Sequence, residues 1–146
     1  MYEQLKLDNQ ICFRLYTASR LMTQAYRPML EPLGLSYPKY LVLLVLWEKD
    51  NMVVGDICRR LSLDTGTLTP LLQRMEADGL IVRTRGIADG RQTLVSLTRK
   101  GATLQEDCKD IPSCMIQRCS DTMLNAEQAS QMVESLDALI NVLKQH

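Results

Sequence analysis

Apolar residues recur at intervals of three and four from residue 8 to about residue 30, which predicts a long amphipathic helix. Asp8 stands just ahead of this pattern and is the expected N-cap. Pro32 and Gly34 follow the segment and mark its end. The apolar positions that define the pattern are Ile11, Leu15, Ala18, Met22, Ala25 and Met29.

A second helix is expected from Ser36 to about Lys49. Ser36 can cap this helix, and Pro38 suits its first turn. The run YLVLLVLW is apolar on almost every side, which indicates a helix buried inside the protein. This run, residues 40–47, is 8 residues long, whereas a membrane-spanning helix needs about 20. No membrane partner is therefore expected.

Two short amphipathic segments, 55–61 and 65–78, follow and are joined by Ser-Leu-Asp. In the second segment the apolar side chains share one face and polar side chains occupy the other, and Gly79 is placed to end the helix. This pattern fits a helix-turn-helix and a plain helical hairpin about equally well. The apolar set is Leu68, Leu71, Leu72 and Met75; the polar set is Thr65, Thr69 and Gln73, with Thr67 at the boundary.

The next segment favours the helix-turn-helix. LIVRTR is β-prone, IADGRQ is a turn and TLVSLT alternates, so these residues predict a β-hairpin. A helix-turn-helix followed directly by a basic hairpin is a winged helix. The remaining chain is predicted to be helical from Arg99 to about Arg118, bent at Pro112, and again from Asn125 to Lys144. The fold class expected is mainly α with a small β-hairpin wing.

The terminal helices carry more apolar surface than a 146-residue monomer can cover. Pairing with a second copy buries this surface, and a two-fold dimer places two recognition helices about one turn of DNA apart, ~34 Å. We therefore expect a homodimer. Residues 1–146 are expected to form one domain, with residues 8–50 and 99–146 as the helical dimerisation region and 51–98 as the DNA-binding lobe.

Charge and cysteine content narrow the class of protein. The formal net charge is zero, but residues 51–100 hold 8 Lys/Arg against 5 Asp/Glu, and residues 101–146 hold 3 against 7. The basic middle hints at a binding face. Five cysteines without a C-x-x-C pair, and a single His, argue against a disulfide framework and against a metal site. The first ten residues lack the apolar core of a signal peptide, so we expect a cytoplasmic protein that needs no cofactor.

The sequence resembles the MarR family of dimeric winged-helix regulators. DGRQTLVSLTRKG, residues 89–101, resembles the wing signature of that family. LDNQICF, AYRPML, SYPKYLVLLVLWE and LDTGTLTPLLQRMEADGL resemble its organic-hydroperoxide-sensing branch, the OhrR-type repressors. The resemblance covers nearly all of residues 5–101 and weakens beyond Gly101.

This resemblance implies that Cys12 is the peroxide sensor and that Tyr26 and Tyr37 support its thiolate. The residues agree, because a cysteine in the first turns of a helix lies in the favourable field of the helix dipole, and the thiolate is the form that attacks a peroxide. Cys12 and Tyr26 are 14 residues apart, or ~21 Å along one helix. A tyrosine that contacts Cys12 must therefore come from the other subunit, at the dimer interface.

Some members of the branch pair the sensor with a second cysteine from the other chain, and others use a small cellular thiol. Three cysteines in residues 108–119 favour the first type here. Cys119 is the preferred resolving cysteine and Cys114 the second choice. Cys58 is expected to pack in the helix-turn-helix, and no role is assigned to Cys108. Tyr16 and Tyr40 are expected to be structural.

The helix of residues 65–78 is expected to enter the major groove of DNA, where Thr65, Thr67, Thr69 and Gln73 contact bases and phosphates. Pro70 predicts that this helix starts near Thr67 or is distorted in its first turns. The resemblance assigns Arg91 to the minor groove and Asp89 to orienting it, although Gln92 stands where the family often has another Arg. Arg83 and Arg85 are expected phosphate contacts, with a solvated surface role as the alternative.

The function expected is a redox-sensing repressor that leaves a palindromic operator when an organic hydroperoxide oxidises Cys12. Two alternatives stay open from the sequence. One is a MarR-type regulator that binds a phenolic ligand non-covalently, and the other is a thiol peroxidase that uses Cys12. The second is disfavoured, because the chain has a DNA-binding element and no peroxidase motif; we do not expect an enzyme.

Overall fold

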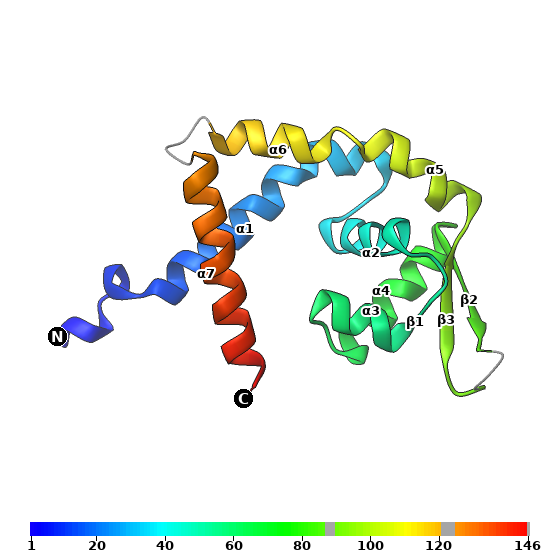
Figure 1. Ribbon diagram of the computed structural model, residues 1–146, viewed down its shortest axis with the longest axis horizontal. Coiled ribbons are helices and arrows are strands. Elements are labelled where there is room, and N and C mark those ends of the chain that lie inside the picture. Colours follow the sequence, from blue (N-terminus) through cyan, green and yellow to red (C-terminus); the bar gives the residue numbers. More distant parts are fainter. Residues whose placement is uncertain (87–89, 121–124, 146) are drawn as a thin grey trace. The chain divides into compact units, whose positions relative to one another are not determined.

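The computed structural model describes residues 1–86, 90–120 and 125–145 (Figure 1). The chain divides into two compact units, Met1–Lys109 and Asp110–His146. The first unit holds most helices and the only described sheet, whereas the second contains α6, Ile111–Ser120, and α7, Ala126–Lys144.

The first unit begins with two short 3-10 turns, Glu3–Leu5 and Leu7–Asn9, followed by the long helix α1, Ile11–Leu30. Asp8 lies inside the second 3-10 turn, so the prediction that it caps α1 is wrong. Gln10 takes the N-cap position with an extended backbone, but its side chain accepts no hydrogen bond from the first turn of α1. Its amide donates instead to the carbonyl oxygens of Gln4, at 2.7 Å, and Lys6, at 3.0 Å. These bonds anchor the turns that displace Asp8.

Helix α2, Tyr37–Glu48, runs through the core, as its apolar sequence predicts. Ser36 is the N-cap and accepts a hydrogen bond from the backbone N–H of Lys39, which confirms the expected start. A short 3-10 turn, Glu31–Leu33, separates α1 from α2, and Gly34 ends it with a φ of 73°. The side chains of α2 that are buried are Tyr40, Val42, Leu43, Val45 and Leu46.

The winged helix follows. It contains β1, Met52–Val53; α3, Val54–Leu61; α4, Thr65–Ala77; β2, Ile81–Arg85; β3, Thr93–Leu97; and α5, Arg99–Cys108. The predicted hairpin is confirmed, with Arg83 opposite Val95, and β1 adds to it an antiparallel strand, so that the strand order is β1-β3-β2. Gly79, at φ 77°, ends α4 as expected.

The apolar face of α4 forms the centre of the winged helix. Leu68, Leu71, Leu72 and Met75 are buried with Ile57 of α3 and with Ile81 and Val95 of the sheet. Burial of such a side chain stabilises the folded state by roughly 1.5–3 kcal/mol. Because the apolar face of α4 is packed into the core, its polar face is left toward the surface of the protein.

The helix predicted from Arg99 to about Arg118 is two helices, α5 and α6, interrupted at Lys109 and Asp110. Pro112 is the second residue of α6. A proline has no backbone N–H and clashes with the preceding turn, so it is favoured in the first turn of a helix over a position in its interior. The predicted bend is therefore a break, placed just before the proline.

Helix α7 has an Asn125 N-cap that shares a capping box with Gln128. No side chain of α7 is buried, although its sequence carries a regular apolar stripe. The exposed apolar residues of this helix are Met132, Val133, Leu139, Ile140, Val142 and Leu143. On α1, Ile11, Phe13, Tyr16, Leu21 and Met22 are likewise exposed.

Among the described residues, no single helix is both long enough and apolar enough to cross a membrane. Only Ile11–Leu33 and Tyr37–Glu48 taken together, which meet at a bend of 75°, reach the required length and composition.

Candidate functional site

Cys12 is the second residue of α1, and its side chain is exposed. The backbone N–H groups of a helix's first turn have no partner within the helix, and the side chain of Gln10 does not cap them. The prediction that Cys12 lies in the first helical turn is confirmed, although the cap residue is different. Its thiol is therefore accessible and lies beside the positive end of a helix dipole.

Tyr26 and Tyr37 lie together. Tyr26 is in the last third of α1, Tyr37 opens α2, and their ring centroids are 4.7 Å apart. Both side chains are half-buried. The fold thus brings together the two tyrosines that the resemblance assigns to one site.

Tyr40 joins this pair as a third ring. Its centroid lies 5.8 Å from that of Tyr26 and 6.2 Å from that of Tyr37, and its far side meets Trp47 at 6.4 Å. Tyr40 is 3% exposed. Burial, with smaller contributions from Tyr26, Cys108 and Tyr37, raises the pKa of Tyr40 to about 12. Tyr40 is therefore a neutral core residue behind the pair.

Cys12 and Tyr26 are not brought together within one chain. Both residues belong to the continuous helix α1, and their 14-residue separation corresponds to ~21 Å along its axis. One chain therefore supplies a thiol at one end of α1 and a pair of phenols at the other.

The other cysteines differ in exposure. Cys108 is buried, and burial followed by the charge of Asp107 raises its thiol pKa. Cys58 is partly buried, with its Sγ 3.9 Å from the Thr65 hydroxyl. Cys114 is exposed and Cys119 is partly buried, both on α6. The pairing of Cys119 or Cys114 with Cys12 stays a prediction.

Helix α4 begins at Thr65 and continues through Pro70, so the late start near Thr67 is not observed. Asp64 is its N-cap and accepts the backbone N–H of Thr67 at 2.7 Å. Hydrogen bonds from the side chain and the backbone of Thr67 lower the pKa of Asp64. Thr65, Thr67 and Gln73 are exposed, whereas Thr69 is half-buried.

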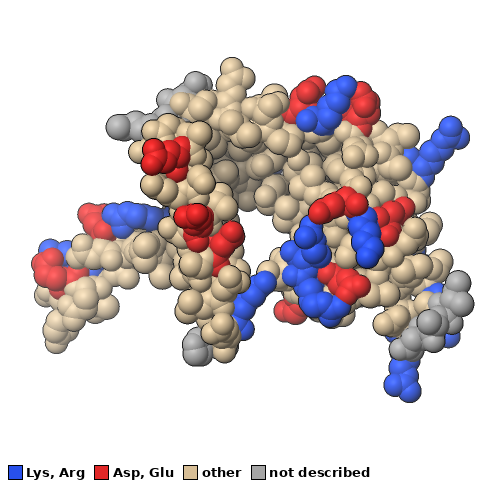
Figure 2. Space-filling view, in the orientation of Figure 1, with Lys and Arg blue, Asp and Glu red and all other residues tan. Residues whose placement is uncertain are grey.

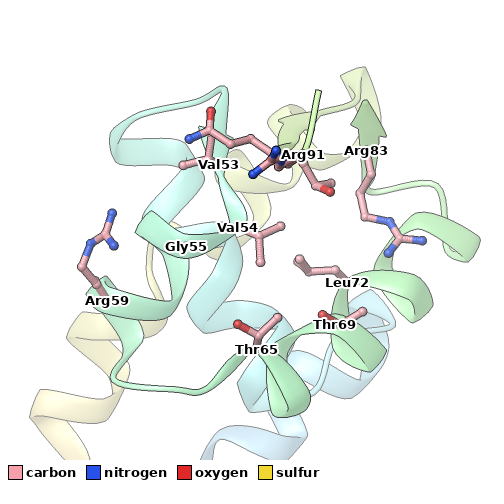
Figure 3. A pocket seen from close by; sticks show the side chains of 11 residues that line it. Val53, Val54, Gly55, Arg59, Thr65, Thr69, Leu72, Arg83 and Arg91 are labelled. Carbon is pink, nitrogen blue, oxygen red and sulfur yellow. The ribbon is translucent and has the colours of Figure 1, made fainter. Parts of the chain in front are cut away.

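A cleft of about 400 Å³ separates α3, α4 and the wing (Figure 3). Thr65 and Thr69 lie on its α4 side, and Arg83 and Arg91 lie on its wing side. Arg59 of α3 also lines the cleft. Four of the residues predicted to bind DNA thus face one concave surface, whereas Thr67 and Gln73 do not line it. Arg85 is exposed at the end of β2, and Asp89 lies outside the described residues.

Arg83 is held by Glu76 of α4, a residue that no sequence pattern singled out. One carboxylate oxygen of Glu76 accepts the backbone N–H of Arg83 at 2.8 Å, and the other accepts the guanidinium at 3.1 and 3.3 Å. These hydrogen bonds lower the pKa of Glu76. Because β2 is an edge strand, this backbone N–H faces outward from the sheet. No sequence pattern links a helix residue to a strand seven positions later.

Lys and Arg side chains gather over the helix-turn-helix and wing, with Asp and Glu side chains between them (Figure 2). The ion pairs Arg59–Asp56 and Arg60–Glu48 account for part of this mixture. No group of three metal-ligating side chains occurs in the part of the chain that the structure describes.

Comparison with known proteins gives consistent matches. A family model described as "Transcriptional regulator SarA/Rot" matches residues 24–108. The organic hydroperoxide resistance transcriptional regulator of Bacillus subtilis (strain 168) is 43% identical over 144 residues, which are 99% of this chain and 96% of that protein.

Solved structures of AbfR of Staphylococcus epidermidis are also similar. Reduced AbfR bound to DNA is 37% identical, with a TM-score of 0.78 over 97% of this chain and 96% of that chain. AbfR in its disulfide form is 37% identical, with a TM-score of 0.66 over 94% of this chain and 95% of that chain. The chain therefore belongs to the MarR family of winged-helix transcriptional regulators, in the branch of the organic hydroperoxide resistance regulators.

Proposed function

We propose that the protein is a homodimeric, redox-sensing repressor that binds a palindromic operator and leaves it when an organic hydroperoxide oxidises Cys12. The observation that carries this proposal is the position of Cys12, exposed at the start of α1, about 21 Å along that helix from a tyrosine pair whose rings are 4.7 Å apart. One chain holds both halves of a peroxide-reactive site, but at opposite ends of one helix.

Two copies complete the site in this proposal. The N-terminal part of α1 of one chain lies beside Tyr26 and Tyr37 of the other, whose hydroxyl groups donate to the Cys12 thiolate. The exposed apolar side chains of α1 and α7 supply the interface that this arrangement needs. Burying them against a second copy is favourable at about 25 cal/mol per Å² of apolar surface.

The chemistry is a two-electron oxidation. The Cys12 thiolate attacks an oxygen of the hydroperoxide, so that an S–O bond forms as the O–O bond breaks. Sulfur becomes a sulfenic acid, and the organic fragment leaves as an alcohol after taking up a proton. The sulfenic acid then condenses with a thiol, forming a disulfide and releasing water. Cys119 of the partner chain is the preferred thiol, followed by Cys114 or a small cellular thiol.

DNA binding uses the exposed face of α4 and the wing. Helix α4 enters the major groove with Thr65, Thr67 and Gln73 outward, while Arg91 of the wing reaches the minor groove and Arg85 contacts phosphates. Arg83 contributes less positive charge than the sequence implies, because Glu76 binds its guanidinium. The two α4 helices of the dimer must lie ~34 Å apart to enter successive major grooves of DNA. Disulfide formation changes this spacing, and the dimer leaves the operator.

A gel-shift titration on the DNA upstream of the protein's own gene tests the proposal. Wild-type protein should bind, release the DNA after one equivalent of cumene hydroperoxide per chain, and bind again after dithiothreitol. Cys12→Ser should bind with wild-type affinity and ignore the peroxide. Mass spectrometry of the same samples should show oxidation of Cys12.

Two results would contradict the proposal. Peroxide-induced release by Cys12→Ser would show that another group is the sensor. Release by a phenolic compound, with Cys12 unmodified by the hydroperoxide, would assign the protein to ligand-binding regulators instead.

A further inference from the structure

Asp78, at the C-terminal end of α4, forms an ion pair with Lys39, which lies close in sequence to Tyr37. The Lys39 ammonium lies 2.7 Å from a carboxylate oxygen of Asp78, the C-cap of α4. Lys39 is the third residue of α2, two positions after Tyr37. The contact joins residues 39 positions apart in the sequence, so it connects two elements rather than stabilising one helix.

The pair is more sheltered than an ordinary surface ion pair. The Lys39 side chain is 17% exposed and that of Asp78 is 42% exposed. Exposed pairs contribute little because water screens them and both side chains lose freedom. A lysine with restricted access to water holds its partner more firmly, because the effective dielectric constant around it is lower.

The first turn of α2 is also the turn that presents Tyr37. Ser36 caps this turn by accepting the Lys39 backbone N–H, so Tyr37 and Lys39 belong to one hydrogen-bonded unit. The next residues of α2 are fixed by burial, with Val42 and Leu43 at 0% exposure. A displacement of Tyr37 therefore reaches Lys39 within one helical turn, besides reaching Tyr40 through the ring contact.

The end of α4 has further contacts from elements outside the tyrosine site. The Lys100 ammonium of α5 donates to the carbonyl oxygen of Asp78 at 2.9 Å, and the Thr98 hydroxyl donates to that of Gly79 at 2.6 Å. These bonds hold the same end of the helix, but their donors belong to the start of α5, with Thr98 as its N-cap, whereas Tyr26 and Tyr37 belong to α1 and α2.

We propose that Lys39 is a positioning residue that couples the tyrosine pair to the DNA-reading helix. This inference rests on the proposed function, in which Cys12 oxidation changes the surroundings of Tyr26 and Tyr37. Tyr37 then moves with the first turn of α2, and the Lys39–Asp78 pair carries the displacement to the end of α4. Coupling between sites needs such a contiguous set of contacts, and single contacts along it change the coupling measurably.

The experiment compares operator affinity before and after oxidation in full-length variants. Lys39→Met keeps an unbranched side chain one atom shorter and removes its charge, and Asp78→Asn removes the charge of the other partner. Lys100→Met is the matched control, because it removes a contact to the same residue from α5. For each protein we measure the rate of Cys12 oxidation by cumene hydroperoxide and the ratio of the operator Kd in the oxidised and reduced states.

Lys39→Met and Asp78→Asn should each lower this Kd ratio by about fivefold or more, and the double variant should lower it no further. Their Cys12 oxidation rates should stay within about twofold of wild type, because neither residue contacts the thiol in the proposed site. Lys100→Met should keep the wild-type ratio, whatever its effect on affinity.

The inference is overturned if both pair variants keep the wild-type Kd ratio, or if the loss of response equals that of Lys100→Met. It is also overturned if Lys39→Met slows Cys12 oxidation in proportion to the lost response, because Lys39 would then act on the thiol. Failure of the wild-type protein to release DNA after Cys12 oxidation would instead remove the proposed function, and the inference with it.

Discussion

Cys12 and Tyr26 lie on one uninterrupted helix, at opposite ends, about 21 Å apart along its axis. Tyr26 is in ring contact with Tyr37, 4.7 Å away, at the start of the next helix. The Cys12 thiol and the Tyr26 phenol cannot meet by bending a loop, because the segment between them is helical throughout, and Tyr37 lies against Tyr26. A site that contains all three residues therefore requires a second chain.

Alkaline titration should single out Tyr40. Burial favours its neutral phenol, which raises its pKa from the ordinary 10.0 to about 12. The folded-state pKa is above the unfolded one, so Tyr40 contributes stability fully below pH 10, and this contribution disappears as the pH rises through 12. Absorbance of the phenolate should show one tyrosine that titrates near 12, and Tyr40→Phe should abolish that step.

Tyr2→Phe is the control for this titration, because Tyr2 is 70% exposed. It should leave the late step intact. A late step that survives in Tyr40→Phe would contradict the assignment of the raised pKa.

Replacing Glu76 should lower the sequence specificity of DNA binding. The carboxylate of Glu76 joins α4 to the backbone and guanidinium of Arg83 in the wing. In Glu76→Ala the Arg83 guanidinium loses its carboxylate partner and becomes available to phosphates, so binding to unrelated DNA strengthens. The backbone N–H of Arg83 also loses its acceptor, so the angle between α4 and the wing is no longer fixed by this contact. The ratio of specific to non-specific affinity should fall about fivefold, and the salt dependence should steepen by about one phosphate contact.

Competition binding at several salt concentrations measures both effects. Glu106→Ala is a suitable control, because Glu106 pairs with Lys109, three residues further along, at the surface. Equal specificity ratios in wild type and Glu76→Ala would show that the Glu76–Arg83 contact does not position the wing.

Gly101→Ala should destabilise the fold. A methyl group at Gly101 would lie 2.1 Å from the backbone carbonyl oxygen of Leu80, and the carbonyl of Gly101 also accepts the Trp47 indole N–H at 2.9 Å. Overpacking of this kind costs about 1–3 kcal/mol. Urea denaturation should show this loss, whereas Gly55→Ala, with its nearest atom 3.8 Å away, should be neutral or stabilising.

The sequence predicted the parts of the fold that follow from local pattern. The apolar run of α2, the Ser36 cap, the Gly79 helix end, the hairpin and the last helix are all observed. Asp8 failed as a cap because the Gln10 side chain binds the preceding turns, a contact that propensity does not encode. The short strand β1 is paired only with a strand more than forty residues later, so no local signal marks it.

The site was predictable only in part, for the same reason. Family resemblance singled out Cys12, Tyr26 and Tyr37, and helix geometry alone separated the first two. The Glu76–Arg83 and Lys39–Asp78 contacts join side chains from different elements, and their residue types are those of ordinary surface charges. Such contacts emerge only when the elements are packed.

Mixed dimers test the two-chain site most directly. One chain carries Cys12→Ser and the other carries both Tyr26→Phe and Tyr37→Phe, so the single remaining Cys12 faces intact tyrosines only if they come from the other chain. We predict that this Cys12 reacts with cumene hydroperoxide at the wild-type rate per thiol, about tenfold or more faster than in the homodimer of the double Phe variant, because two hydroxyl donors to the thiolate are retained. A mixed-dimer rate equal to that of the double Phe homodimer would contradict the account.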